Sequence, residues 1–141
     1  DKPEDNRDPE KNPLVFSQAV QRTLARLRHK EVIIVKSVPE YQTRVPDSFA
    51  KAAIFGDGQL PPELQVTRTD YRERNREVEA AWEMVSPEQA TLIETADYLC
   101  DEDLCRYSTN SGLLYMDDNH LSHLGANRFL QQLRRELPEL L

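Results

Sequence analysis

Apolar side chains recur at helical spacing in three parts of this 141-residue sequence. This spacing predicts helices over residues 14–29 and 67–85 and after Ser122, whose hydroxyl is expected to cap the last one. Thr67 or Thr69 is expected to cap the second helix. The apolar faces are Phe16, Val20, Leu24 and Leu27 in the first helix, Tyr71, Val78, Trp82 and Val85 in the second, and Ala126, Phe129, Leu130, Leu133 and Leu137 in the last.

Two short runs of β-branched and other apolar residues lie between these helices, at 32–35 and at 90–94. A run that is apolar on both faces is typical of a strand buried between two helix layers. A hairpin is also predicted, through Asn110-Ser111-Gly112 into residues 113–115.

The order helix–strand–helix–strand–irregular segment–helix predicts an α/β fold in which crossover helices join parallel strands. Because two buried strands need neighbours on their edges, we expect the C-terminal half of a doubly wound parallel sheet with flanking helices. Residues 1–13 are predicted to be a flexible arm or loop, and residues 14–141 to be the C-terminal part of a single domain. Residues 40–66 hold several prolines and glycines, so no element longer than one or two turns is expected there, apart from a short helix over 48–54.

Composition narrows the function classes. With 38% apolar and 30% charged residues, the chain suits one folded domain. Its net charge is 18 − 25 = −7, which argues against a nucleic-acid partner. No run of about 18 apolar residues predicts a membrane-spanning helix. The chain begins at Asp1 without a signal-like segment, which suggests a processed product or a fragment.

Two cysteines, Cys100 and Cys105, lie in the sequence CDEDLC. This spacing differs from a CxxC redox or zinc motif, the three histidines are scattered, and no metal site or cofactor is expected. The two thiols are either reduced and buried or joined as a disulfide, and we favour the disulfide. Closing so small a loop would stabilise the fold by about 2 kcal/mol and would imply an oxidising compartment.

The densest polar cluster is YMDDNHLS, residues 115–122, just before the last helix. A turn here would let Asp117 accept a hydrogen bond from Nδ1 of His120, which leaves Nε2 free as a base. Asp118 is an alternative partner. The pattern also fits a simpler interpretation, in which the acidic residues satisfy helix amides and His120 is an incidental surface residue.

Other candidates are weaker. Ser108 and Ser111 lie near His120 in sequence, but no serine sits in a GxSxG elbow or a GDS turn. Glu40 follows a predicted strand at the end where α/β sites are built, although a solvated acid is the simpler interpretation. The remaining candidates are interpreted as ordinary structural positions: the Gly56-Asp57-Gly58 turn, Trp82 in the core, His123 in a first helical turn and His29 at a helix end.

The sequence VIIVKSVPE, the Cys100/Cys105 pair and the block from Tyr115 to Ser122 with Gly125-Ala126 together resemble a known family. The C-terminal half of the chain resembles the end of the SGNH (GDSL-like) hydrolase fold, which is flavodoxin-like. More narrowly, it is similar to the extracytoplasmic SGNH domain fused to acyltransferase-3 membrane proteins. The order of elements matches from about Leu14 to Leu137.

The resemblance implies that Asp117 and His120 are the acid and base of a Ser-His-Asp triad. It implies an acyl donor delivered by a membrane acyltransferase-3 domain, a polysaccharide acceptor and a site on the periplasmic face of the inner membrane. The family's GDS serine and its oxyanion donors are not found in this sequence, so the nucleophile and the missing N-terminal half of the domain are expected elsewhere, and this chain alone is expected to be inactive. Two alternatives remain open: an SGNH esterase or deacetylase fragment, and a non-catalytic glycan-binding or interaction module.

Overall fold

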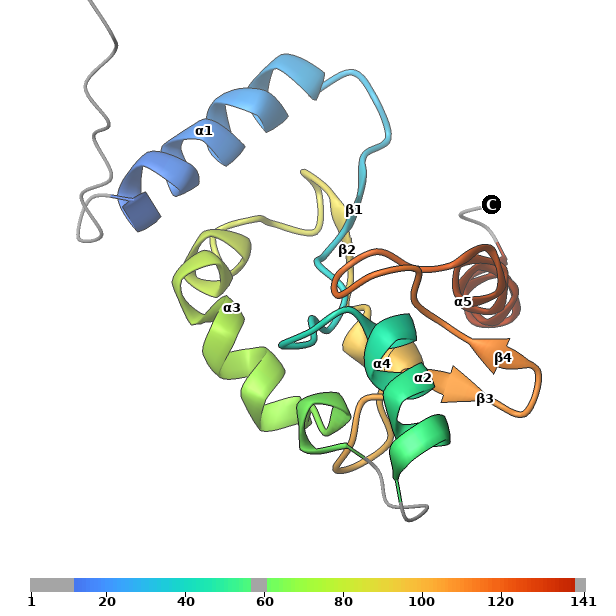
Figure 1. Ribbon diagram of the computed structural model, residues 1–141. Helices are drawn as coiled ribbons and strands as arrows, with labels where there is room; N and C mark the ends of the chain where they lie inside the picture. The colour runs from blue at the N-terminus through green and yellow to red at the C-terminus, as the bar shows by residue number, and fades with distance from the viewer. Residues whose placement is uncertain (1–11, 57–60, 139–141) are drawn as a thin grey trace, which may run out of the picture. The chain divides into compact units, whose positions relative to one another are not determined.

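A computed structural model describes residues 12–56 and 61–138 of the chain (Figure 1). It contains five α-helices, one 3₁₀ turn and four short strands within these residues. In chain order they are α1 (Asn12–Leu27), β1 (Ile33–Val35), α2 (Val45–Phe55), η1 (Pro62–Leu64), α3 (Arg68–Trp82), β2 (Thr91–Ile93), α4 (Ala96–Leu99), β3 (Ser108–Thr109), β4 (Gly112–Leu113) and α5 (His123–Glu136).

The chain divides into two compact units. The first comprises residues up to Val35 together with Glu73–Ile93, and the second comprises Lys36–Arg72 together with residues from Glu94 onward. No helix among residues 12–56 and 61–138 is long and apolar enough to cross a bilayer.

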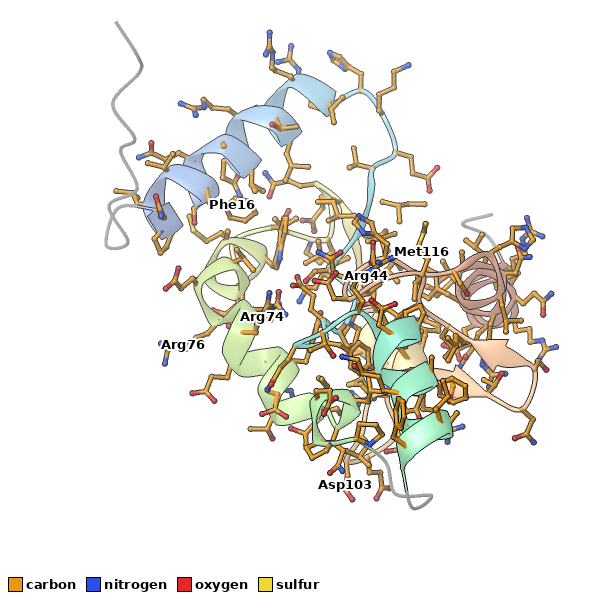
Figure 2. All side chains as sticks on the ribbon, in the orientation of Figure 1. Phe16, Arg44, Arg74, Arg76, Asp103 and Met116 are labelled. Atoms are coloured by element: carbon orange, nitrogen blue, oxygen red, sulfur yellow. A yellow bond between two sulfur atoms is a disulfide. The ribbon has the colours of Figure 1, made fainter. Side chains whose placement is uncertain are left out.

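In the first unit, β1 and β2 form a parallel pair with Ile34 opposite Leu92. Phe16 of α1 packs edge-to-face on Trp82 of α3, with ring centroids 5.3 Å apart; Phe16 is labelled in Figure 2. Trp82 is therefore a packing residue, as predicted.

The predicted burial of β1 on both faces is wrong. Val35 is 52% exposed, and the other two residues of the strand are half-buried. Strand side chains point to the two faces, and apolar β-branched residues alone do not create the layers that must cover both faces.

The core of the second unit gathers around aromatic side chains. Tyr41 packs edge-to-face on Tyr115, with ring centroids 4.9 Å apart. Tyr98 of α4 packs in the same way on Phe129 of α5, with centroids 5.2 Å apart. The buried cluster around Tyr41 and Tyr115 consists of Tyr41, Val45, Leu64, Val66, Tyr71, Ala96, Cys100, Cys105, Leu114 and Tyr115.

Most predicted elements are present, but two boundaries need correction and one helix was missed. The predicted arm of residues 1–13 overlaps α1, which begins at Asn12; residues 1–11 lie outside the described part of the chain. The short helix predicted over 48–54 is present as α2, but its 11 residues begin earlier, at Val45, and end at Phe55. Pro46 stands in its first turn, where the fixed φ of proline favours a helix start. The short helix α4 was not predicted.

The hairpin is confirmed, with β3 pairing antiparallel to β4. Gly112 has a φ of +135°, a conformation that L side chains rarely adopt. The α/β class agrees with the helices and the parallel pair, whereas the doubly wound sheet stays a prediction.

Candidate active site

Residues 115–122 form a closed loop between β4 and α5. The Met116 amide donates to the His120 carbonyl at 2.9 Å. The Ser122 amide donates to the Leu114 carbonyl at 2.8 Å, which ties the start of α5 to the end of β4. The loop therefore has a defined backbone, with the Met116 side chain exposed on it (Figure 2).

The Asp117 carboxylate organises this loop from within. Its Oδ1 accepts hydrogen bonds from the amides of Asn119, at 3.0 Å, and His120, at 2.7 Å. Its Oδ2 lies 2.9 Å from Nδ1 of the His120 ring. The Asn119 amide, with the amide and ring of His120, holds the pKa of the Asp117 carboxyl below its ordinary value. Asp117 is therefore an ionised acceptor at neutral pH.

The His120 ring is fixed on one side and open on the other. Because an ionised carboxylate only accepts hydrogen bonds, the Nδ1 atom of His120 must be the donor in this pair, and Nε2 of the neutral ring then carries a lone pair. The His120 side chain is 70% exposed and that of Asp117 is 28% exposed. Nε2 has no hydrogen-bond partner among the described residues. The arrangement can thus accept a proton from a group that approaches from outside the loop.

A second segment holds the loop from the side of α2. The amide of Tyr41 donates to the Asp118 carbonyl at 2.9 Å, and the amide of Val45 donates to the Asp117 carbonyl at 3.2 Å. Val45 is fully buried, so the first turn of α2 is anchored in the core. The predicted alternative role for Asp118 is not seen, because the ring of His120 contacts Asp117.

The segment that leads to Tyr41 is itself anchored by polar contacts. The Thr95 hydroxyl donates to the Ser37 carbonyl, and Lys36 Nζ forms an ion pair with Glu94 Oε2 at 3.2 Å. The Tyr71 hydroxyl donates to the other oxygen of Glu94 at 2.6 Å. These contacts fix the backbone that follows β1 and so steady the Tyr41 amide.

Ser122 is a cap, as predicted. Its Oγ accepts from the Gly125 amide at 3.1 Å and donates to the Leu113 carbonyl at 2.7 Å. A Cβ on Gly125 would overlap the carbonyl oxygen of Leu114, so only glycine fits in this turn of α5. Because the Ser122 hydroxyl both donates and accepts a hydrogen bond within the fold, its role is structural.

Within the described residues, the other sequence candidates make no side-chain hydrogen bond to the His120 ring, whose contact is with Asp117. No hydrogen bond in the described part of the chain joins a serine hydroxyl to His120. His123 is exposed in the first turn of α5, where Nδ1 lies 3.2 Å from the side-chain nitrogen of Asn127, and Glu40 is half-buried with a partner of its own. Of the Gly56-Asp57-Gly58 turn, residues 57 and 58 lie outside the described residues.

Three supporting features escaped sequence reasoning: the Tyr41 amide, the Val45 amide and the close approach at Gly125. A backbone amide is not marked by residue type, whereas Gly125, a glycine inside a predicted helix, is itself a sign of close packing. Tyr115 adds a fourth feature. Its hydroxyl is buried without a hydrogen-bond partner among the described residues, and burial raises its pKa, so it stays protonated.

The disulfide between Cys100 and Cys105 is confirmed, which removes the alternative of two reduced thiols. Asp101 stiffens the loop that the disulfide closes, because its Oδ1 accepts from the amides of Asp103, at 3.1 Å, and Leu104, at 2.8 Å. Among residues 12–56 and 61–138, no cluster of three or more His, Cys, Asp or Glu side chains is placed to hold a metal ion.

Comparison with known families now gives this geometry a context. The family model of the SGNH domain fused to AT3 domains matches residues 1–135. The chain therefore belongs to this family of SGNH domains, a hydrolase-like module of acyltransferase fusions. Searches of curated proteins and of solved structures gave no match.

Proposed function

We propose that this chain supplies the histidine and the aspartate of a Ser-His-Asp site in an extracytoplasmic O-acyltransferase, which transfers an acetyl group to a cell-envelope polysaccharide. One observation carries the proposal. Nδ1 of His120 lies 2.9 Å from Oδ2 of Asp117, while the rest of the ring is exposed. An aligned imidazole with an open Nε2 is the base that serine activation requires.

The proposed chemistry has two balanced halves. In the first, Nε2 of His120 takes the proton of a serine hydroxyl, whose oxygen attacks the carbonyl carbon of the acyl donor; the leaving group departs with that proton. In the second, Nε2 takes the proton of an acceptor hydroxyl, which attacks the acyl-serine, and the serine oxygen leaves with the proton. Asp117 stabilises the imidazolium formed in each half.

The serine is proposed to come from a part of the parent protein outside this sequence, because no GDS turn occurs here. A membrane AT3 domain is the proposed source of the acyl group, which the family description supports by naming that fusion. The disulfide supports a periplasmic location, since disulfides persist in oxidising compartments.

A second candidate is an esterase or deacetylase of the same type, in which water takes the place of the acceptor hydroxyl. The His120 side chain is 70% exposed in this chain, so its open face can receive water as well as an acceptor hydroxyl. Transfer and hydrolysis are separated by measuring free acetate alongside the acetylated polysaccharide.

The decisive experiment replaces His120→Ala in the parent protein and measures the O-acetyl content of the cell-envelope polysaccharide by ¹H NMR. Losing the base is expected to slow transfer by about a thousandfold or more. His123→Ala is the matched control, because His123 is an exposed histidine three residues away and is expected to retain activity. Wild-type O-acetylation in the His120→Ala parent would remove His120 from the mechanism.

The isolated chain gives a complementary control. Incubated with an aryl acetate, it is expected to gain no acetyl group on serine by mass spectrometry, because the proposed nucleophile is absent. An acetyl-serine that forms in the chain and disappears in His120→Ala would contradict the assignment of the nucleophile to another segment.

A further inference from the structure

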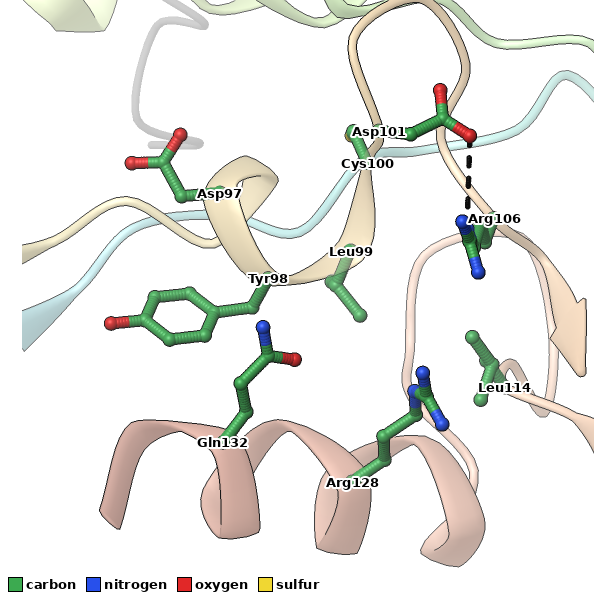
Figure 3. Close-up of a pocket in the computed structure, with 9 residues that line it drawn as sticks. All are labelled: Asp97, Tyr98, Leu99, Cys100, Asp101, Arg106, Leu114, Arg128 and Gln132. Carbon is green, nitrogen blue, oxygen red and sulfur yellow. Dashed lines mark ion pairs between the residues drawn. The ribbon is translucent and has the colours of Figure 1, made fainter. Parts of the chain in front are cut away.

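A second polar concavity lies between α4 and α5, beside the disulfide (Figure 3). It has a volume of about 190 Å³. Arg128 and Gln132 extend into it from α5, and Arg106 faces it from the start of the hairpin. We call this space the α4–α5 hollow. It is smaller than the roughly 300–1,000 Å³ that encloses a drug-sized ligand, so its size suits a single small ring.

Two donors in the hollow are uncommitted. Within the described residues, neither the guanidinium of Arg128 nor the carboxamide of Gln132 has a hydrogen-bond or ion-pair partner. Arg106 is held only loosely, with its Nε 3.7 Å from an oxygen of Asp101. Arg128 is exposed and Gln132 is half-buried, so both donors are open to a polar ligand that replaces water.

Acceptors lie on the opposite wall. Asp97 forms an ion pair with Arg68 at 2.8 Å, and Asp101 faces Arg106. Tyr98 is hydrogen-bonded to Glu136. Burial, and then the charge and hydrogen bond of Glu136, raise the pKa of the Tyr98 hydroxyl. Arginines and carboxylates are balanced in the lining of the hollow: Arg106 and Arg128 against Asp97 and Asp101. A balanced wall gives an anion little electrostatic advantage, whereas it offers both donors and acceptors to a neutral group.

Apolar residues contribute less to the hollow. Leu99, Leu114 and Cys100 of the disulfide line it, and all three residues are buried. The side chains open to a ligand are therefore the polar ones described above. A sugar ring carries hydroxyls that are each both donor and acceptor, so it matches a lining that offers both kinds of group.

We propose that the α4–α5 hollow binds one neutral sugar residue, as a subsite for the polysaccharide acceptor. Leu114, which lines the hollow, lies three residues before Asp117, and three residues of chain span at most about 11 Å. The hollow is therefore close along the chain to the loop that carries His120. The role as acceptor subsite rests on the acyltransferase proposed above, whereas sugar binding itself does not.

The test is a titration of the ¹⁵N-labelled 141-residue chain, followed by NMR, with glucose, galactose, mannose and N-acetylglucosamine as neutral probes and glucuronate as the anionic probe. At least one neutral sugar is expected to give saturable shifts at the side-chain amide of Gln132 and the backbone of residues 98–106. The absence of saturable shifts with every neutral sugar would overturn the proposal, and binding of glucuronate alone would reassign the hollow to anions.

Matched variants on α5 separate the hollow from the rest of the helix surface. Gln132→Ala is expected to weaken binding of the neutral sugar by about tenfold, the value of one good hydrogen bond. Gln131→Ala removes the same group from an exposed neighbouring position and is expected to leave binding unchanged. Equal effects of the two substitutions would contradict the site. The titration measures binding only, so a negative titration would not contradict the proposed chemistry of His120. A His120→Ala parent that keeps its transfer activity would contradict that chemistry but not sugar binding in the hollow.

Discussion

Gly125 shows how one residue sets the geometry of the loop before α5. A Cβ there would overlap the carbonyl oxygen of Leu114, and that same carbonyl accepts a hydrogen bond from the Ser122 amide. The end of β4 and the first turn of α5 therefore touch through backbone atoms. This contact fixes both ends of the loop that holds Asp117 and His120.

Substituting Gly125→Ala is expected to lower the free energy of unfolding by about 2 kcal/mol, because the added methyl forces the two backbones apart. Asn127→Ala in the same helix is the control and is expected to change stability by less than about 0.5 kcal/mol, since Asn127 is exposed. Denaturant unfolding measures both. Equal stability of Gly125→Ala and the original chain would contradict the close contact between position 125 and the Leu114 carbonyl.

The Asp117–His120 pair could be predicted from sequence, because a carboxylate three residues before an imidazole meets it whenever the chain turns between them. Its supports could not. The amides of Tyr41 and Val45 bind the loop through backbone N–H groups, which every residue except proline possesses. The side chains at these positions therefore do not predict the contact.

At the scale of elements, α3 begins with a reciprocal cap. The Thr67 hydroxyl accepts from the Asp70 amide at 3.0 Å, while the Asp70 carboxylate accepts from the amide and the hydroxyl of Thr67, at 2.8 and 2.6 Å. These hydrogen bonds, from the hydroxyl first and then from the amide, lower the pKa of the Asp70 carboxyl. Of the two caps that the sequence offered, the structure uses Thr67.

Thr67→Ala is expected to cost about 1 kcal/mol of stability at neutral pH. Thr69→Ala, which removes no hydrogen bond among the described residues, serves as the control. Because the pKa of Asp70 is lowered in the fold, its contribution is present above the ordinary Asp pKa of about 4 and is lost as pH falls through the folded value. The difference between the original chain and Thr67→Ala should thus shrink in acid. A difference that grows in acid would contradict the cap.

Element types followed well from apolar periodicity, whereas element lengths and burial did not. α2 runs to Phe55 although Ile54 and Phe55 are 71% and 84% exposed, so no apolar stripe marked its extent. α4 has four residues, too few for a period to be read. The exposure of Val35 depends on what packs on its face of β1, which its own residue type does not encode.

At the scale of the whole molecule, the acid–base pair, its anchoring segment, the disulfide and the α4–α5 hollow all belong to the second of the two units. The chain thus keeps together the parts proposed to activate a hydroxyl and to bind a sugar. The doubly wound sheet, the serine and the acyl donor stay proposals, because the incomplete strand pairing and the family resemblance suggest them while the 141 residues do not contain them.

The most direct test concerns the proton on His120. Two-dimensional ¹H–¹⁵N NMR of the ring nitrogens, recorded at a pH where titration shows the ring to be neutral, identifies the tautomer. We expect the proton on Nδ1 in the original chain, loss of that preference in Asp117→Asn, and no change in the control Asp118→Asn. A proton mainly on Nε2 in the original chain, or the same tautomer in Asp117→Asn, would contradict the alignment on which the proposed function depends.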